Sequence, residues 1–290
     1  MKIGVIGVGI MGSAIARNLM KAGSSVIGYD ISDRRLSELE GAGGTAARSV
    51  AELAGEAEIA LTSLPSVAAL DVTVSALLAR PRPGLVVAEL STLPIEAKLR
   101  ARDALAAGGI GLLDCPISGT GAQAVTGDLA VYASGERAAY DRMAGIFPHF
   151  ARVTHYLGEF GNGSKMKFVA NLLVAIHNVA SAEAMVLGMK AGLDPAEIVK
   201  VIASGVGTSR IFELRAPLMA KNSYEPPTMK VEIWQKDMAV ISAFAASHGV
   251  ATPLFSASAP IYNAAIGQQR GGEDTAAVCA VLEEMSGLKR

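Results

Sequence analysis

The first half of the chain alternates short apolar runs with longer stretches of mixed polarity. The runs are KIGVIG, SSVIGYD, AEIALTSLP, PGLVVAELS and GIGLLDCPIS. Stretches with helical character, such as GVGIMGSAIARNLMKAG and IEAKLRARDALAAGG, lie between them. Strands that alternate with helices of about 10–15 residues are typical of a parallel sheet covered on both faces. We therefore expect a doubly wound α/β sheet in this half.

The pattern changes near residue 165, where the strand signals stop. The remaining sequence predicts helices separated by turn sequences such as GLDP, NSYEPP, HGVATP and RGGED. We predict an α/β domain over residues 1–163, followed by an all-α domain over residues 164–290 that serves substrate binding and oligomerisation.

A glycine-rich turn follows the first predicted strand. Gly7, Gly9 and Gly12 form the pattern G-x-G-x-x-G, with Ile10 and Met11 inside it. The three glycines permit a tight turn, a close approach of backbone to pyrophosphate, and close packing of helix on strand. The helix that starts here offers unpaired N–H groups to phosphate. We predict a Rossmann-type cofactor site that includes all five residues.

An acidic residue ends the second predicted strand. Asp30 is placed to accept hydrogen bonds from ribose hydroxyls, and its charge would repel a 2′-phosphate, which favours NAD over NADP. Arg34 and Arg35 follow, either as solvated residues of the next helix or as partners for that phosphate. NAD is the predicted cofactor, and NADP stays open.

Two lysines stand near the start of the long apolar stretch FVANLLVAIHNVASAEAM. At about 100° per residue, Lys167 shares a helical face with Asn171 and Asn178, whereas Lys165 shares the opposite face with Glu183. Lys165 therefore reads as a solvated charge. Lys167 is either a lysine whose stem packs on the core, or part of a polar cluster that moves a substrate proton.

Six segments in order resemble the β-hydroxyacid dehydrogenase family, which includes 3-hydroxyisobutyrate dehydrogenase and tartronate semialdehyde reductase. The resemblance covers essentially the whole chain. The segments are GVGIMGSAIARNLMKAG (7–23), Leu64–Pro65, Ser91–Thr92, DCPISGTGAQAVTGDL (114–129), GEFGNGSKMKFVAN (158–171) and QKDM (235–238).

The resemblance implies roles for residues that the patterns alone leave open. It makes Lys167 the catalytic acid/base and Asn171 its support. It assigns Ser118, Gly119 and Thr120 to the substrate carboxylate. Further cofactor contacts follow at Leu64, Pro65, Thr92 and Lys236. The chain departs from the family at Thr120, where a second glycine is common, so the identity of the substrate does not carry over.

These residues together predict an NAD-dependent oxidoreductase that interconverts a small 3-hydroxy acid and its semialdehyde or keto acid. The alternatives are an NADPH-preferring reductase of small aldehyde acids of the glyoxylate or succinic semialdehyde type, an imine reductase, and a non-catalytic NAD-binding scaffold. Lys167 speaks against the last two, because such relatives usually lack that lysine.

The composition of the chain excludes several classes of binding partner. Of the 290 residues, 51% are hydrophobic and 18% charged, and the formal net charge is −1, which argues against nucleic acid or an anionic membrane surface. The two cysteines are too few for a disulfide framework, and no metal site is expected. We expect a cytoplasmic protein without membrane spans, active as a homodimer or homotetramer.

Overall fold

The computed structural model describes residues 1–290 and consists of two compact units, Met1–Lys167 and Phe168–Arg290. The division falls inside the long helix α8 (Asn162–Lys190). The domain boundary that we expect between residues 163 and 164 remains a prediction.

The first unit is built on a six-stranded sheet in the order β3-β2-β1-β4-β5-β6, and every pair in it is parallel. After β3 the chain returns to the far side of β1, so β1 and β4 flank a point where the strand order reverses. This confirms the predicted α/β class. The strands are β1 (Lys2–Ile6), β2 (Ser25–Tyr29), β3 (Thr45–Ala46), β4 (Ile59–Thr62), β5 (Val86–Glu89) and β6 (Gly111–Asp114).

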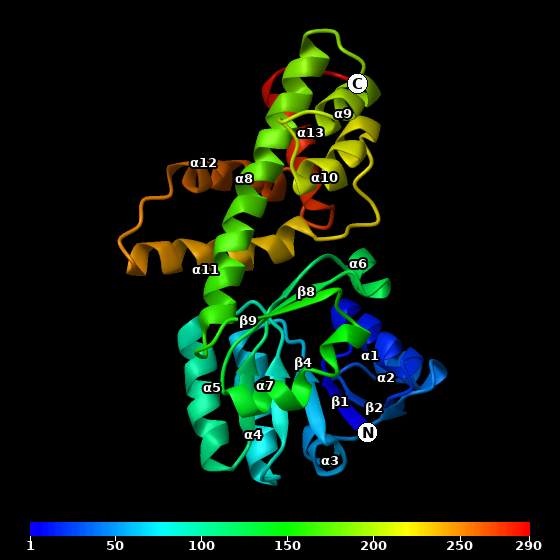
Figure 1. Ribbon diagram of the computed structural model, residues 1–290. Helices are drawn as coiled ribbons and strands as arrows, with labels where there is room; N and C mark the ends of the chain where they lie inside the picture. The colour runs from blue at the N-terminus through cyan, green and yellow to red at the C-terminus, as the bar shows by residue number, and fades with distance from the viewer. The chain divides into compact units, whose positions relative to one another are not determined.

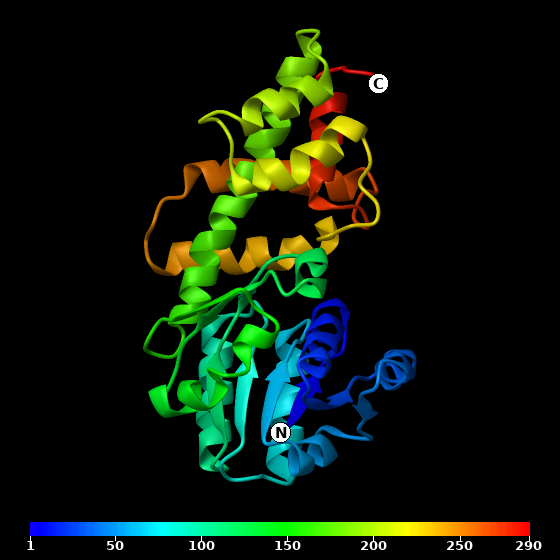
Figure 2. The same ribbon diagram turned by 45° about the vertical axis from the view of Figure 1, so that its right-hand side comes forward.

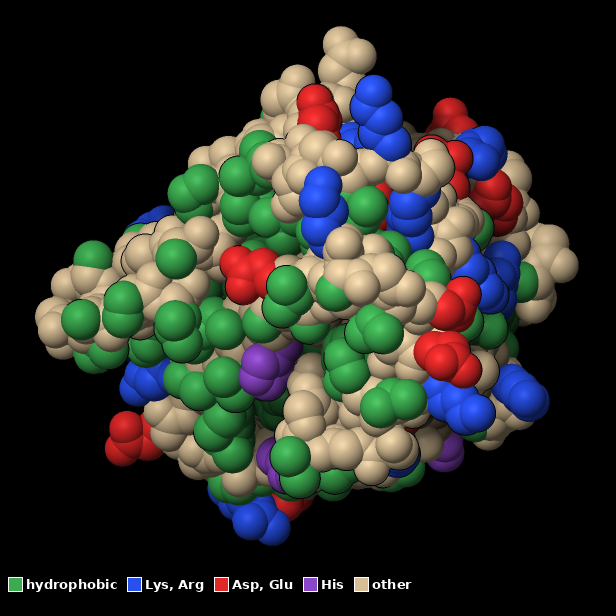
Figure 3. Space-filling view, turned by 90° about the horizontal axis from the view of Figure 1, so that it is seen from above, with side chains coloured by type: hydrophobic (Ala, Val, Ile, Leu, Met, Phe, Trp, Pro, Cys, Tyr) green, Lys and Arg blue, Asp and Glu red, His purple; other side chains and the backbone are tan.

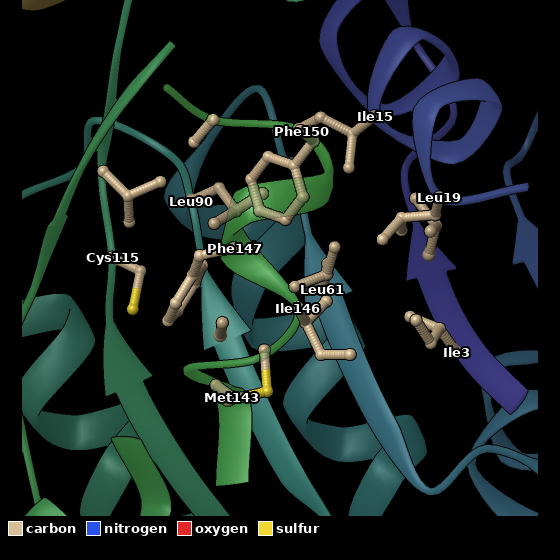
Figure 4. Packing of buried hydrophobic residues seen from close by; sticks show 14 of the residues in the cluster. Ile3, Ile15, Leu19, Leu61, Leu90, Cys115, Met143, Ile146, Phe147 and Phe150 are labelled. Atoms are coloured by element: carbon tan, nitrogen blue, oxygen red, sulfur yellow. The ribbon is translucent and has the colours of Figure 1, made fainter. Parts of the chain in front are cut away.

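Helices cover both faces of this sheet (Figure 1), and each face has its own hydrophobic core. On one face lie α1 (Ile10–Lys21), α2 (Asp33–Gly41) and α7 (Arg137–Met143), and on the other α3 (Val50–Glu56), α4 (Val67–Ala79) and α5 (Ile95–Ala107). Successive strand residues alternate between the cores, with Val5 in one and Ile6 in the other. Phe147 and Phe150 fill the first core beside Ile15 of α1 (Figure 4).

A second, three-stranded sheet follows the first, and the hydrophobic pattern did not predict it. The run GIGLLDCPIS, expected as one strand, is divided into β6 and β7 around Cys115–Pro116. Proline has no N–H for a ladder, which explains the interruption. The elements of this region are β7 (Ile117–Ser118), α6 (Gly121–Val125), β8 (Ala130–Ala133), the 3₁₀ turn η1 (Phe147–His149) and β9 (Val153–Tyr156).

The second unit is helical, as the loss of strand signals predicted. Within it, α11 and α12 lie side by side and run in opposite directions (Figures 1 and 2). Phe168 at the start of the unit packs edge-on against Phe244 of α11, with ring centroids 5.2 Å apart. After α8, the elements are α9 (Pro195–Ala203), α10 (Arg210–Lys221), α11 (Val231–Ser247), α12 (Pro253–Gly267), η2 (Thr275–Ala277) and α13 (Val278–Met285).

Helix α8 is the one helix that is long and apolar enough to cross a membrane. Half of its most apolar stretch is buried inside the structure, however. Its fully buried Asn178 donates hydrogen bonds to the hydroxyl of Tyr262 (3.0 Å) and the carbonyl of Thr275 (2.9 Å). A buried amide with two protein partners belongs to the core of a folded unit.

Candidate active site

The glycine turn between β1 and α1 has the shape of a dinucleotide cradle. Gly7 has φ +89°, and a Cβ there would lie 2.2 Å from the carbonyl oxygen of Ser63. At Gly12 a Cβ would lie 1.9 Å from the carbonyl oxygen of Gly7. The N-cap of α1 is Gly9, which offers no side-chain hydrogen bond to the first turn. The backbone N–H groups of that turn are therefore available to a phosphate.

Asp30 lies directly after β2, beside the glycine turn, because Gly7 N–H donates to the carbonyl of Tyr29 (2.8 Å). Asp30 is 9% exposed, and its carboxylate accepts a hydrogen bond from the N–H of Ser32 (3.0 Å). The second carboxylate oxygen lies 3.6 Å from the guanidinium of Arg35. That guanidinium also lies 3.1 Å from where a Cβ of Gly9 would be.

The two arginines after Asp30, which the sequence left equivalent, differ in their surroundings. The Arg34 side chain is 79% exposed and pairs with Glu38 one turn away on the same helix. Arg35 instead faces Asp30 and the glycine turn. Only Arg35 is placed to contact a group bound there.

Further predicted cofactor residues lie at the carboxyl ends of β4 and β5. The N–H of Leu64 donates to the hydroxyl of Ser91 (2.8 Å), which joins the two loops. Pro65 follows Leu64 and is exposed, and Thr92 follows Ser91 and is half-buried. Ligands of open parallel sheets bind at this edge, beside the point where the strand order reverses.

The predicted substrate segment begins at β7 and lies against the glycine turn. Ser118 ends β7 and is half-buried, and Gly119 has φ +141°. A Cβ at Gly121 would lie 2.8 Å from Cγ2 of Ile10, so the segment approaches the predicted dinucleotide cradle closely. The structure thus brings two of the predicted subsites together within the first unit.

Thr120, the departure from the family pattern, is the N-cap of α6. Its hydroxyl accepts from the N–H of Gln123 (3.4 Å), and its own N–H donates to the side-chain oxygen of Gln123 (3.0 Å). This reciprocal capping box satisfies both groups within the protein. Of the predicted carboxylate donors, Ser118 therefore has fewer competing partners than the Thr120 backbone.

The start of α8 is anchored on β6. The carboxylate of Asp114 accepts hydrogen bonds from the N–H and the hydroxyl of Ser164, each 2.7 Å long. A Cβ at Gly163 would lie 2.2 Å from the carbonyl oxygen of Tyr132 and 2.7 Å from that of Asp114. Helix and sheet are consequently in direct backbone contact at this point.

Lys167 follows one turn later and is 8% exposed. Asn171, one further turn along α8, is 4% exposed. Lys165 is exposed and donates to the side chain of Asn162 (3.0 Å), and Glu183 is exposed as well. The predicted separation of the two lysines onto a buried and a solvated face of α8 is confirmed.

In the second unit, Asn171 has a partner that the sequence reasoning missed. Its Nδ2 donates to Oδ2 of Asp237 (2.9 Å), which is 6% exposed. The other carboxylate oxygen of Asp237 lies 3.5 Å from the amine of Lys236, whose side chain is 35% exposed. The segment QKDM contains both Lys236 and Asp237, but the family resemblance assigned a role to Lys236 alone. The bond to Asp237 orients the Asn171 amide.

Trp234 and Cys115, whose side chains could in principle take part in binding or catalysis, are buried in the interior. Trp234 is 3% exposed and packs against Tyr262, with ring centroids 6.2 Å apart. Cys115 is fully buried, and burial raises the pKa of its thiol well above the ordinary value, with Asp114 adding to the effect. A thiol held neutral in this way is a poor nucleophile.

Comparison with known proteins agrees with this geometry. Residues 2–158 match the family described as the NAD binding domain of 6-phosphogluconate dehydrogenase. Residues 161–282 match the family described as "NAD-binding of NADP-dependent 3-hydroxyisobutyrate dehydrogenase". The chain belongs to the β-hydroxyacid dehydrogenase family. It is accordingly an NAD(P)-dependent enzyme.

Individual members of the β-hydroxyacid dehydrogenase family match over nearly their full lengths. L-threonate dehydrogenase of Cupriavidus necator is 32% identical over 97% of this chain and 95% of its own. Glyoxylate/succinic semialdehyde reductase 1 of Arabidopsis thaliana is 30% identical over 98% and 99%. The crystal structure of 3-hydroxyisobutyrate dehydrogenase from Salmonella typhimurium has a TM-score of 0.88 and 29% identity, covering 97% and 99%.

Proposed function

We propose that this β-hydroxyacid dehydrogenase interconverts a small 3-hydroxy acid and its semialdehyde or keto acid, with Lys167 as the acid/base. The observation that carries the proposal is the buried lysine one turn before a buried amide, on a helix anchored beside the substrate segment. The nicotinamide cofactor, when bound, supplies the acceptor or donor of hydride.

Lys167 is suited to receive the hydroxyl proton during oxidation. A lysine in water holds its proton too firmly to act as a base near neutral pH. Lys167 is 8% exposed, and withdrawal from water is the general way in which a protein makes a lysine a better base. In the reverse direction the same amine, once protonated, polarises the carbonyl and returns the proton. Asn171 orients the lysine or the reacting oxygen, held in turn by Asp237.

Ser118 and Gly119 hold the substrate carboxylate in this proposal. They lie at the end of β7, where the following residues contact the glycine turn. Thr120 shapes the acid pocket with its methyl group, while its N–H stays with Gln123. Fixing the carboxylate places the carbon bearing the hydroxyl at a defined site, and positioning of this kind accounts for a large part of enzymatic rate enhancement.

NAD is the proposed preferred cofactor because Asp30 is available to ribose hydroxyls beside the glycine turn. The proposed contacts further comprise Gly7, Gly9, Ile10, Met11, Gly12, Leu64, Pro65, Thr92 and Lys236. Arg35 weakens the preference for NAD, because its guanidinium near Asp30 would partly offset the repulsion between that carboxylate and a 2′-phosphate.

A reductase of small aldehyde acids is the second candidate. The observation that favours it is the 30% identity to the glyoxylate/succinic semialdehyde reductase over essentially both chains. The same residues serve both directions, because the lysine that accepts a proton from the alcohol donates it to the carbonyl. The equilibrium and the supply of cofactor in the cell then decide the direction.

We also propose that the enzyme is a cytoplasmic homodimer or homotetramer. Large apolar side chains are exposed along α8, with Val169 at 54%, Leu173 at 48% and Leu187 at 73%. Apolar side chains also gather over the projecting end of α11 and α12 (Figure 3), where Leu254 is 68% exposed. Extensive apolar surface of this kind is characteristic of protein interfaces. Light scattering that detects monomers alone would contradict the assembly.

The function is tested with an activity panel on the purified protein. Candidate substrates are 3-hydroxyisobutyrate, threonate, glycerate, serine, 4-hydroxybutyrate and the corresponding aldehydes, each with NAD(H) and NADP(H). We expect turnover with at least one hydroxy acid, and loss of turnover in Lys167→Ala with NADH binding retained in a fluorescence titration. Near-normal turnover in Lys167→Ala would refute the role of the lysine.

A further inference from the structure

A buried ionic cluster lies at the carboxyl ends of β5 and β6, and the proposed chemistry does not use it. The amine of Lys98 on α5 lies 2.5 Å from Glu89 and 2.8 Å from Asp114, and all three side chains are completely buried. Burial by itself lowers the pKa of Lys98, but the two carboxylates outweigh it and hold that pKa above the ordinary value. The lysine is therefore a permanent cation.

One side of the cluster holds the proposed cofactor loops. The amine of Lys98 donates to the carbonyl of Ser91 (2.7 Å), and Glu89 accepts from the N–H of Ser91 (2.9 Å). The hydroxyl of Ser91 in turn accepts from the N–H of Leu64 (2.8 Å). Both backbone polar groups of Ser91 are thus fixed by the cluster, immediately before Thr92.

The other side of the cluster holds the start of α8. Asp114 accepts from the N–H and hydroxyl of Ser164, three residues before Lys167. The hydroxyl of Ser134 accepts from the N–H of Gly163 (2.9 Å) and lies 3.2 Å from Asp114. Asp114 is the group common to the lysine and the helix, so one carboxylate connects them.

Stability alone is a poor reason for such a cluster. Removing three charges from water is costly, and apolar replacements of a buried ionic group are often as stable as the original. What the ions add is direction, because each hydrogen bond fixes a donor and an acceptor in a defined geometry. The partners fixed here are the first turn of α8 and the residue that joins the β4 and β5 loops.

We infer that Lys98, Glu89 and Asp114 are positioning residues that set the proton-transferring Lys167 in register with the cofactor loops. The inference rests on the proposed function of Lys167. The two carboxylates have separate roles, since Asp114 acts through Ser164 on the catalytic helix, whereas Glu89 acts through Ser91 on the cofactor loops. Lys98 holds both carboxylates at a fixed separation.

The separate roles of the carboxylates give a test that a purely structural role would not satisfy. Asp114→Asn keeps the size of the side chain but removes the charge from the start of α8, so kcat should fall at least tenfold with the KM for NAD(H) changed less than threefold. Glu89→Gln should raise the KM for NAD(H) at least fivefold with a smaller change in kcat. If Asp114→Asn and Glu89→Gln changed kcat and the KM for NAD(H) in the same proportions, the inference would be overturned.

The matched control is Leu105→Ala on the same helix as Lys98. Leu105 is 1% exposed and lies about two turns beyond Lys98, in the hydrophobic core between α5 and the sheet, so the variant loses stability without removing a group of the cluster. Its melting temperature should fall while kcat and KM stay within twofold of the parent enzyme. A kinetic loss in this control as large as in Asp114→Asn would show that destabilisation alone explains the effect, and the inference would fail.

Single variants that leave unbalanced charge are at risk of not folding. The neutral triple variant Lys98→Met, Glu89→Gln, Asp114→Asn removes all three charges together. We expect it to fold and to show both kinetic defects, with kcat and cofactor KM each worse at least fivefold. Parent-like kinetics in the triple variant would overturn the inference, and so would its failure to fold, which would make the cluster a requirement of stability.

Failure of the inference is distinguishable from failure of the proposed function. An active parent with an inactive Lys167→Ala variant supports the function, whatever the cluster variants do. Activity that survives in Lys167→Ala refutes the function directly. The cluster variants are interpreted only in a parent enzyme whose activity depends on Lys167.

Discussion

Ser164 donates both its backbone N–H and its hydroxyl to the carboxylate of Asp114, at 2.7 Å each. This pair joins the last residue of β6 to the first turn of α8, and the proposed acid/base follows three residues later. Lys167 therefore stands near the anchored N-terminal end of a helix of 29 residues. Changes to the groups around this arrangement should affect turnover, cofactor choice and stability in separable ways.

The first prediction concerns the pair Asn171 and Asp237. Asn171→Ala removes the amide that we propose orients the reacting groups, and we expect kcat to fall by about 10–100-fold, as for other misplacements of catalytic groups. Because the two side chains are hydrogen-bonded, a double-mutant cycle with Asp237→Ala should show coupling of about 0.5–3 kcal/mol in the activation free energy. Additive effects would mean that Asp237 does not act through the amide.

The second prediction concerns cofactor choice. Asp30→Ser replaces the carboxylate proposed to accept from ribose hydroxyls by a neutral hydroxyl, and it leaves Arg35 without its carboxylate partner. The ratio of kcat/KM with NAD to kcat/KM with NADP should fall at least tenfold. Arg34→Ala is the control, since that side chain is 79% exposed and pairs with Glu38. An unchanged ratio in Asp30→Ser would refute the proposed contact between Asp30 and the ribose.

The third prediction compares two glycine-to-alanine changes. At Gly12 the new Cβ would meet the carbonyl oxygen of Gly7 at 1.9 Å, so the turn must distort and NADH binding should weaken at least tenfold in a fluorescence titration. At Gly55, inside α3, no atom lies within 4 Å of the new Cβ. Gly55→Ala should stabilise the protein by up to about 1 kcal/mol, measured by denaturant unfolding. If NADH binding weakened equally in Gly55→Ala, the loss in Gly12→Ala would not be specific to the glycine turn, and the assignment of that turn to the dinucleotide would be contradicted.

The fourth prediction concerns acid stability through Asp274 in the second unit. Burial by itself raises the pKa of this carboxyl, but Arg215 and hydrogen bonds from Thr228 and Ala276 outweigh it and hold that pKa below the ordinary value. A lowered folded-state pKa gives stability that is complete above the unfolded pKa of about 3.9 and is lost as pH falls through the folded value.

Replacing Asp274 by Asn tests this dependence. At neutral pH the variant leaves the buried Arg215 without its counter-charge, and we expect a loss of about 3–5 kcal/mol in the free energy of unfolding. Between pH 6 and pH 3 the parent should lose more stability than the variant, because the variant has no carboxylate to protonate. Parallel stability curves over that pH range would contradict the assignment.

The sequence predicted the parts of the fold that repeat locally. Strands of the parallel sheet are continuous apolar runs, and the glycine turn carries its pattern within six residues, so both are visible without knowledge of the fold. The helical wheel of α8 likewise separated Lys167 from Lys165, because buried and exposed positions recur every turn. Family resemblance then supplied the roles that periodicity cannot.

The residues that escaped prediction depend on partners far along the chain. Lys98 looks like a surface residue of an amphipathic helix, yet its carboxylates come from β5 and β6. Arg34 and Arg35 are adjacent and chemically equal. They differ only in their positions around the axis of α2, which direct the two side chains to different partners. The strands β8 and β9 have four residues each, too few for an alternating pattern to stand out. In each case tertiary geometry decides, and no local pattern records it.

Gly163 limits how this enzyme can be engineered. Glycine weakens a helix, so a programme of thermostabilisation would select this position for replacement. Any side chain would have to enter space already occupied by the carbonyl oxygens of Tyr132 and Asp114. Libraries that vary the start of α8 should keep this residue constant, since even a methyl group would force α8 away from the strands that it contacts.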